Sequence, residues 1–263
     1  MSNITAAARL EIIRHKNRPT VNDYIPLIFR NFTELHGDRL YGDDPAIKGG
    51  VAFFRDTPVT VIAQVKGRSL SENKAVNFGM PHPEGYRKAM RLAKQAEKFG
   101  RPVIALADTP GAFCGIAAEE RGQGEAIARC LFEFSTLKTP IISIILGEGG
   151  SGGALALCMG DELAMLENAL YSVISPRGFA SILWKDPKKE ALAADTLKIT
   201  AEDMVSFGVA ESIIPEPSGG AHNDLAATVA YITEYLEEAI PRLVVTDTDE
   251  LLKKRTAKFR EKF

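Results

Sequence analysis

The chain has 263 residues, of which 45% are hydrophobic and 25% are charged, and its formal net charge is −2. This balance is ordinary for a globular protein and gives no indication of nucleic-acid or membrane-surface binding. No apolar run approaches the roughly 18–20 residues of a membrane span, and the charged N-terminus lacks the apolar core of a signal peptide. We therefore expect a cytoplasmic protein.

The three cysteines indicate a reducing environment. Cys114, Cys130 and Cys158 cannot all pair with one another, and none lies in a C-x-x-C unit. This usage fits the cytosol best, and we expect no zinc site built from this chain alone.

The N-terminal part is predicted to contain two helices, a loop and a β-hairpin. Pro26 is expected to disturb the second helix, and β-rich runs flank a turn at Asp56-Thr57-Pro58. The expected elements are helices 1–16 and 20–35, a loop over 36–50, and strands 51–56 and 58–67.

The central part alternates helices with two near-continuous apolar strands, PVIALAD (102–108) and PIISIIL (140–146). This pattern is typical of a parallel sheet that is covered on both faces. Before the first of these strands we expect a loop over 68–85 and a helix over 84–99 that Gly100 ends. Between the two strands we expect a turn at 109–112 and a helix over 117–137.

The C-terminal part is predicted to be mostly helical, with Thr200 and Asp247 as N-caps. Short strands are expected at 162–166 and 169–175. The expected helical segments are 152–160, 175–184, 186–197, 200–208 and 224–260. The simplest organisation is a single α/β domain over 1–263, with N-terminal helices (1–40), a core (41–215) and a helical tail (216–263).

The segment GEGGSGGA, residues 147–154, raises the main functional question because five of its eight residues are glycine. The simplest interpretation is a tight turn in which glycines permit close packing. A second is dinucleotide binding, since Gly147, Gly149 and Gly152 fit G-x-G-x-x-G and Glu167 follows at a suitable distance.

A third interpretation is a nucleophile elbow, because Gly149–Gly153 fits G-x-S-x-G around Ser151. A triad in the chain order Ser, Asp, His would then consist of Ser151, one of three aspartates (Asp186, Asp195 or Asp203) and His222. A phosphate-binding P-loop is excluded, because Gly153 stands where that motif needs lysine.

A fourth interpretation uses only the main chain. Amide groups at a glycine turn that opens a helix can form an oxyanion hole. A similar segment, ADTPGAFCG at 107–115, also ends a buried strand. Two such turns on neighbouring parallel strands would flank one pocket, an arrangement that resembles the crotonase architecture.

The sequence closely resembles the family of bacterial acetyl-CoA carboxylase carboxyltransferase α subunits. The resemblance runs from Gly37 to His222 with similar spacing throughout. The matching segments are GDRLYGDDPAIKGG, QVKGR, NFGMPHPEGYRKAMRLAKQAEKFG, DTPGAFCG, AEERGQGEAIAR, GEGGSGGALAL, YSVISPRGFASILWK and ESIIPEPSGGAH.

This resemblance implies a crotonase (ClpP/crotonase-like) fold, a spiral of ββα units with peripheral helices. It also implies transfer of a carboxyl group from carboxybiotin to acetyl-CoA, which gives malonyl-CoA for fatty acid biosynthesis. The implied partners are a zinc-containing β subunit in an α2β2 heterotetramer, the biotin carboxyl carrier protein and biotin carboxylase. On this basis carboxybiotin and acetyl-CoA are substrates, and neither a covalently bound cofactor nor a metal is expected on this chain.

The resemblance also assigns residues. Main-chain amides of Gly152, Gly153 and Ala154 are expected to form the oxyanion hole for the biotin ureido oxygen. Substrate-binding residues are expected at Gly111, Ala112, Phe113, Gly149, Gly150, Ser151 and Phe179. Candidate contacts to substrate or partner are Lys66, Arg68, Arg87 and Arg177, for which surface charges or structural ion pairs are an equally good interpretation.

The sequence departs from the family pattern in two segments. Arg177 and Phe179 stand where VISPEGCASILW is common, and Phe113 and Cys114 replace the tyrosine and proline of GAYPG. Two further hypotheses therefore stay open: an independent crotonase-type enzyme acting on acyl-CoA, and a non-catalytic paralogue that binds the β subunit without supporting transfer.

Overall fold

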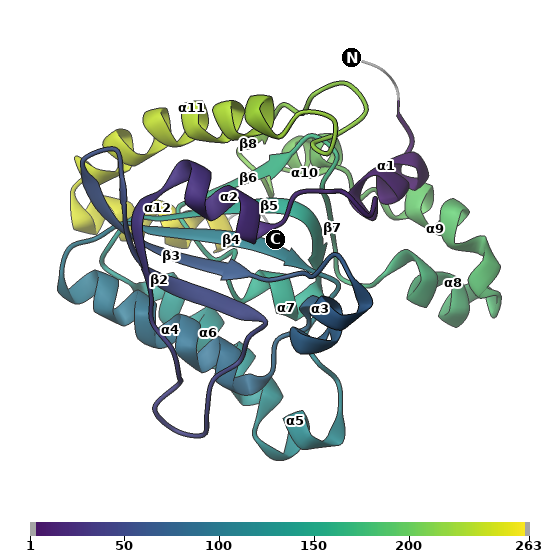
Figure 1. The fold of residues 1–263 in the computed structure, drawn as a ribbon, viewed down its shortest axis with the longest axis horizontal. Helices are drawn as coiled ribbons and strands as arrows, with labels where there is room; N and C mark the ends of the chain where they lie inside the picture. Colours follow the sequence, from purple (N-terminus) through teal and green to yellow (C-terminus); the bar gives the residue numbers. More distant parts are fainter. Residues whose placement is uncertain (1–3, 261–263) are drawn as a thin grey trace.

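The computed structural model describes residues 4–260. Residues 1–3 of the predicted first helix and 261–263 of the predicted tail lie outside this range. Over the described residues the strands form one eight-stranded sheet in the order β1-β2-β3-β4-β5-β6-β8, with β7 paired to β5 (Figure 1). The strands are β1 (Arg30–Glu34), β2 (Ile47–Phe54), β3 (Thr57–Gln64), β4 (Val103–Thr109), β5 (Ile141–Gly150), β6 (Glu162–Leu166), β7 (Leu170–Ser172) and β8 (Ser212–Ile214).

The sheet changes from antiparallel to parallel at β3. The hairpin of β2 and β3 was predicted and is confirmed, and β1 pairs antiparallel with β2. From β3 onward the pairings between the strands of residues 4–260 are parallel, and one isolated antiparallel bridge joins Leu170 of β7 to Thr200. One edge of β5 pairs first with β6, through Ile142–Ile145, and then with β7, through Glu148–Gly150. The carboxyl ends of β3, β4 and β5 therefore meet at one edge of the sheet.

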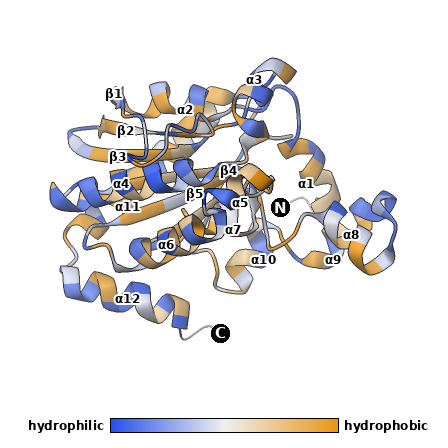
Figure 2. Cartoon of the chain, turned by 90° about the horizontal axis from the view of Figure 1, so that it is seen from below, coloured by the Kyte–Doolittle hydropathy of each residue, from blue (hydrophilic) through white to orange (hydrophobic). Residues whose placement is uncertain are grey.

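Helices cover both faces of the sheet. Ile104 and Leu106 of β4 pack in a core with α2 and α11, whereas Val103 and Ala105 pack in a second core with α4 and α6. In Figure 2 the ribbon of the central strands between these layers carries the colours of hydrophobic residues. The covering helices are α2 (Val21–Ile28), α4 (Pro83–Lys98), α6 (Gln123–Thr136) and α11 (Leu225–Val244).

The remaining helices are shorter or peripheral. Helices α8 and α9 pack on each other and extend from the body at the right of Figure 1. The bounds are α1 (Ala6–Ile13), α3 (Leu70–Ala75), α5 (Ile116–Glu120), α7 (Ser151–Leu155), α8 (Pro176–Trp184), α9 (Glu190–Leu197), α10 (Ala201–Ser206) and α12 (Thr248–Arg260), with 3₁₀ turns η1 (Asn77–Gly79) and η2 (Pro187–Lys189). No helix within residues 4–260 is both long and apolar enough to cross a bilayer.

The predicted helix over 20–35 is wrong in its second half. Helix α2 ends where Phe29 adopts an extended conformation, and residues 30–34 form the edge strand β1. Pro26 is accommodated within the first half. The bonds that β1 makes to β2 outweigh the helical pattern, which shows that local periodicity yields to sheet pairing.

Several other boundaries differ from the prediction. Gly122, with φ of 81°, separates α5 from α6, where one helix was expected over 117–137. The loop expected over 68–85 contains α3, whose N-cap Ser69 accepts from the Glu72 amide, and η1. Strand β5 continues to Gly150, so α7 ends at Leu155 rather than near residue 160, and β7 is only three residues long.

One buried arginine, Arg255, binds the C-terminal helix α12 to the body of the protein. The Arg255 side chain is 1% exposed and binds both carboxylate oxygens of Asp161 at 2.7 and 2.8 Å. It also donates to the carbonyl oxygens of Phe134, Leu137 and Thr139. This set of bonds ties α12 to the segment between α6 and β5.

We predict that Arg255→Ala lowers the free energy of unfolding by about 3–5 kcal/mol, because it leaves the Asp161 carboxylate without its buried partner. Urea denaturation measures this change. The control is Lys254→Ala, which removes an exposed i,i+4 pair with Glu250 and should cost less than about 0.5 kcal/mol. Equal small losses in both variants would contradict the anchoring role.

Candidate functional site

Two glycine-containing turns touch each other at the carboxyl ends of β4 and β5. Thr109 pairs with Gly149 in the sheet. A Cβ added to Gly150 would lie 2.3 Å from the backbone of Pro110, and one added to Gly153 would lie 2.5 Å from the Ala112 amide nitrogen. Any larger side chain would push the turns apart. The predicted adjacency of the two turns is therefore confirmed.

The other glycines of the 147–154 segment are mostly explained by packing as well. A Cβ on Gly147 would lie 2.8 Å from the Asp108 carboxylate, and one on Gly149 would lie 2.8 Å from the Tyr171 ring. At Gly152 the first contact is an ordinary 3.5 Å to Ile127. Close packing thus accounts for four of the five glycines, and Gly152 is the exception.

Gln64 at the end of β3 holds both turns. Its Nε2 donates to the Gly153 carbonyl at 2.7 Å, and its Oε1 accepts from the Asp108 amide at 3.1 Å. The Tyr86 hydroxyl also donates to the Gly153 carbonyl, at 3.4 Å. Because a trans peptide directs its N–H opposite its C=O, the Ala154 amide points away from Gln64, toward the N-terminal end of α7.

The amides at the start of α7 are available to an anion. Among residues 4–260, the Gly152 and Gly153 amides have no hydrogen-bond acceptor. Gly152 is partly exposed, whereas Gly153 and Ala154 are buried. In the facing turn, Gly111 has a φ of 146°, which favours glycine, and its amide donates to the Thr109 hydroxyl. Main-chain donors without acceptors, like those of Gly152 and Gly153, can stabilise developing negative charge.

A buried ion network surrounds the turns. Lys66 Nζ lies 2.8 Å from Asp108 and 2.7 Å from Glu148, and the Glu148 carboxylate also binds Arg14 of the N-terminal segment at 3.0 Å. Burial favours a neutral Glu148, but the charges of Lys66 and Arg14 outweigh it and lower the pKa of Glu148 to about 2. The Asp108 carboxylate accepts from the Glu148 amide at 2.9 Å, so the network also fixes the backbone between the turns.

Two cavities lie along these strand ends. One of about 330 Å³ is bounded by the 13–20 segment and the end of β3, and the other, of about 50 Å³, runs beside Gly149 and Gly150. Both are lined by Arg14, Pro110 and Glu148, so the Arg14–Glu148 pair lies between them. Residues 152–154 line neither of these two cavities.

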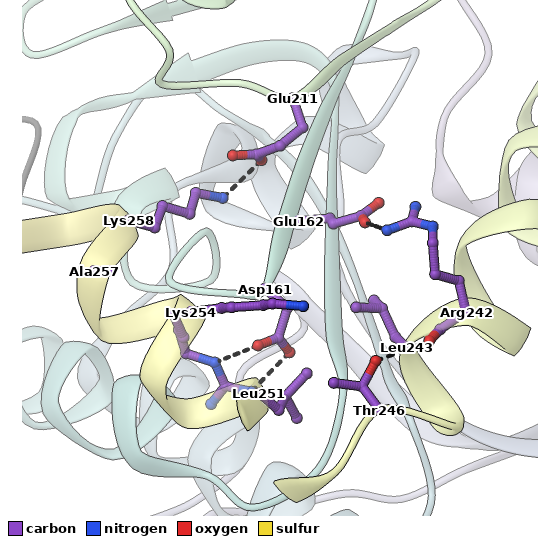
Figure 3. Close-up of a pocket in the computed structure, with 11 residues that line it drawn as sticks. Asp161, Glu162, Glu211, Arg242, Leu243, Thr246, Leu251, Lys254, Ala257 and Lys258 are labelled. Carbon is purple, nitrogen blue, oxygen red and sulfur yellow. Dashed lines mark hydrogen bonds and ion pairs between the residues drawn. The ribbon is translucent and has the colours of Figure 1, made fainter. Parts of the chain in front are cut away.

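A larger cavity, of about 570 Å³, lies at the opposite ends of the strands (Figure 3). Its acids are already neutralised, because Asp161, Glu162 and Glu211 pair with Arg255, Arg242 and Lys258 respectively. Ligands of open parallel sheets bind at the carboxyl ends of strands, and Glu162 opens β6 at its amino end. We therefore place the candidate site at the glycine turns.

The other residues singled out from the sequence have varied surroundings. Arg68 is bound to Asp23, and Arg87 donates to Asp38 at 2.7 Å and to the Arg121 carbonyl, which makes Arg87 part of a structural network. The Phe113 amide donates to the Pro81 carbonyl. On α8, Arg177 is exposed, and Phe179 packs edge-to-face on Trp184 at 5.4 Å.

The two competing motifs lack their expected geometry. Gly147 and Gly149 lie within strand β5 rather than in a turn, and the Glu167 carboxylate accepts from the Glu216 amide. Ser151 has a left-handed φ of 50°, as an elbow would, but among residues 4–260 its hydroxyl has no hydrogen bond to His222. The His222 ring instead stacks on His15 at 3.9 Å.

Sequence reasoning missed several residues that form the site. Asp108 and Glu148 carried a usable signal, since each is a charged residue at the carboxyl end of a buried strand. Gln64 carried no such signal, because it is a polar residue inside an apolar strand. Arg14 carried no such signal either, because it is distant in sequence from the glycine segment. In the described part of the chain no group of three or more His, Cys, Asp or Glu side chains is arranged to hold a metal ion.

The network predicts a specific pH dependence. The pKa of Glu148 falls from 4.5 to about 2 on folding, so its stabilising contribution is complete above about pH 4.5 and is lost as the pH falls toward 2. Glu148→Gln should therefore show a shallower loss of unfolding free energy across this window than the unmodified protein. Urea titrations at several pH values test this. If the unfolding free energies of the variant and the unmodified protein change with pH in parallel, the result would contradict the network.

The cysteines should differ in reactivity. Burial raises the pKa of both Cys130 and Cys158 to about 12, whereas Cys114 is exposed beside Phe113. Because the thiolate is the reactive form, N-ethylmaleimide near neutral pH should modify only Cys114 in the folded protein. Intact-mass and peptide mass spectrometry measure this, and rapid labelling of either buried thiol would show that the packing is wrong.

Comparison with known proteins identifies the family. A family model described as acetyl co-enzyme A carboxylase carboxyltransferase-like matches residues 1–262. The acetyl-coenzyme A carboxylase carboxyl transferase subunit alpha of Clostridium botulinum (strain Eklund 17B / Type B) is 58% identical over 253 residues, covering 96% of this chain and 92% of that protein. The protein of the same name from Listeria innocua is 54% identical over 260 residues, covering 99% and 82%.

Solved structures establish the fold. A transcarboxylase 12S structure superimposes with a TM-score of 0.69 at 20% identity, covering 88% of this chain and 44% of that chain. A Pseudomonas malonate decarboxylase hetero-tetramer in complex with coenzyme A gives a TM-score of 0.65 at 20% identity, covering 84% and 91%. The expected crotonase-like fold is thus confirmed. With a match over nearly its whole length, the chain belongs to the acetyl co-enzyme A carboxylase carboxyltransferase-like family.

Proposed function

We propose that this chain is the α subunit of an acetyl-CoA carboxylase carboxyltransferase. With a β subunit it transfers a carboxyl group from carboxybiotin to acetyl-CoA and forms malonyl-CoA. The observation that carries this proposal is the pair of touching turns at the carboxyl ends of β4 and β5, in which the Gly152 and Gly153 amides have no acceptor among residues 4–260. The high identity to the Clostridium and Listeria α subunits supports the same activity.

The amides of residues 152–154 would act on the biotin side of the reaction. When the carboxyl group leaves N1 of biotin, negative charge develops on the ureido oxygen. The Gly152 and Gly153 amides, which have no acceptor among residues 4–260, are placed to donate to that oxygen, and Gln64 fixes the Gly153 carbonyl that follows them. One such donor contributes about 2.7–4 kcal/mol to the transition state in comparable sites.

This mechanism needs no side-chain base from the chain. In this mechanism the N1–carboxyl bond breaks to give CO₂ and the ureido anion, the anion takes a proton from the acetyl methyl group, and the enolate then attacks the released CO₂. The ionisable groups beside the turns, Lys66, Asp108 and Glu148, are mutually paired. Their role in this proposal is to keep the turns in place rather than to exchange protons.

The partners follow from the same proposal. The β subunit supplies the acetyl-CoA site, and the biotin arrives on a carrier protein that a biotin carboxylase has loaded in an ATP-dependent step. The β subunit would complete the site at residues 152–154, which line neither of the two cavities at the strand ends. We place the assembly in the cytoplasm as an α2β2 heterotetramer.

The direct test is the reverse reaction of the purified complex. The chain, co-purified with its cognate β subunit, is expected to convert malonyl-CoA and biocytin into acetyl-CoA and carboxybiocytin, while either subunit alone is inactive. A folded cognate complex without turnover would contradict the proposal. Hydration of an enoyl-CoA by the isolated chain would instead favour an independent crotonase-type enzyme.

Gln64→Met should separate catalysis from binding. The variant keeps the side-chain volume but releases the Gly153 carbonyl and the Asp108 amide, so kcat of the complex should fall about 100-fold with little change in KM for malonyl-CoA. The control is Ser143→Ala, which removes another fully buried hydrogen bond, to the Leu157 carbonyl at 2.7 Å, away from the turns. It should lower stability by about 1 kcal/mol and leave kcat unchanged; a similar kcat in both variants would refute the role of Gln64.

A further inference from the structure

Gln123 is a buried polar residue at the start of α6 to which the mechanism above gives no task. It is 4% exposed and follows Gly122, where the chain breaks between α5 and α6. Its Nε2 donates to the Phe113 carbonyl at 2.8 Å and to the Pro81 carbonyl at 2.9 Å. Because both neighbours are acceptors, the amide nitrogen is the end that must face them. One side chain thus joins the 109–113 turn to the segment before α4.

The same two segments also meet through other bonds. The Phe113 amide donates to the Pro81 carbonyl at 3.0 Å, and the Thr109 hydroxyl lies 2.6 Å from the Gly79 carbonyl oxygen. Among residues 4–260 the Phe113 carbonyl has no donor besides Gln123. Removal of the Gln123 amide would therefore free the last carbonyl of the turn.

The segment before α4 is a firm support for the turn. The His82 amide donates at 2.7 Å to the carboxylate of Asp44, a residue that is 1% exposed. Asn77 and Phe78 have left-handed φ angles of 49° and 57°, which residues other than glycine keep only where the surroundings fix them. Because this segment is fixed independently, bonds to it restrain the turn.

The position of the 109–113 turn affects the amides at the start of α7. A Cβ on Gly153 would lie 2.5 Å from the Ala112 amide nitrogen and 2.6 Å from the Gly111 carbonyl carbon, so the turn packs directly on Gly153. The Gly152 and Gly153 amides have no acceptor among residues 4–260. Their direction is therefore set by this packing and by the Gln64 bond to the Gly153 carbonyl.

We propose that Gln123 is a positioning residue for carboxyl transfer. It holds the 109–113 turn against Gly153 and so keeps the Gly152 and Gly153 amides in their working direction. This inference rests on the proposed function, which assigns those amides to the developing charge. Gln123 acts through the turn and exchanges no proton. It complements Gln64, which binds the Gly153 carbonyl directly.

The test compares Gln123→Met with Thr139→Val in the complex with the β subunit. Methionine has a similar length but no donor, so kcat for the reverse reaction should fall about tenfold with KM for biocytin and for malonyl-CoA unchanged. Thr139→Val removes another buried bond, from the hydroxyl to the Arg101 carbonyl at 2.8 Å, just before the amino end of β5. It should leave kcat unchanged. An unchanged kcat in Gln123→Met, or an equal fall in both variants, would overturn the inference.

Gln123→Glu gives a second kinetic measurement. A protonated carboxyl group can donate to one of the two carbonyls, whereas a carboxylate can donate to neither. Burial favours the protonated form, so the ratio of kcat in Gln123→Glu to kcat in Gln123→Met should rise as the pH is lowered from about 8 to about 6. The neighbouring network of His82, Glu84 and Arg121 is common to both variants and cancels in the ratio. A ratio that does not change with pH would refute the donor role.

Hydrogen exchange keeps the positioning role separate from the proposed function, because it needs no turnover. In the complex, Gln123→Met should speed amide exchange in a peptide covering residues 109–115 about tenfold, and Thr139→Val should not. This difference in a complex that transfers no carboxyl group would refute the proposed function and support the restraint of the turn. Exchange at 109–115 that is the same in Gln123→Met as in the unmodified complex would refute the restraint itself.

Discussion

The direct contact between two backbone turns is the constraint on which the site depends. Gly150 lies against Pro110, and Gly153 lies against Gly111 and Ala112, at distances that exclude even a methyl group. Because β4 and β5 are hydrogen-bonded neighbours in the sheet, this contact sets where each turn directs its amides. The glycines therefore have a mainly structural task, and the chemical role falls to the N–H groups that the packing leaves without acceptors.

Polar side chains around the turns make this arrangement rigid. Gln64 satisfies one carbonyl of α7 and one amide of β4, while Lys66 joins Asp108 to Glu148. All of these groups are buried or nearly so, where an unpaired partner would be costly. An oxyanion hole works because its donors need no rearrangement when charge appears. The buried network supplies that preorganisation.

The parts of the structure that sequence could predict are those with a strong local signal. The apolar runs of β4 and β5 identify a covered parallel sheet, and the spacing of α4 identifies its apolar face. Strand β1 could not be found in this way, because pairing with β2 overrides a helical pattern. The glycine segment was located from sequence, but its division between strand β5 and helix α7 depends on contacts with residues about 40 positions away.

The most direct measurement is a crystal structure of the complex with the β subunit and bound biocytin. The account predicts that the ureido oxygen lies about 2.7–3.1 Å from at least one amide nitrogen of residues 152–154. A biotin ring bound elsewhere, or one whose ureido oxygen faces side chains of the β subunit with these amides bonded to water, would contradict it.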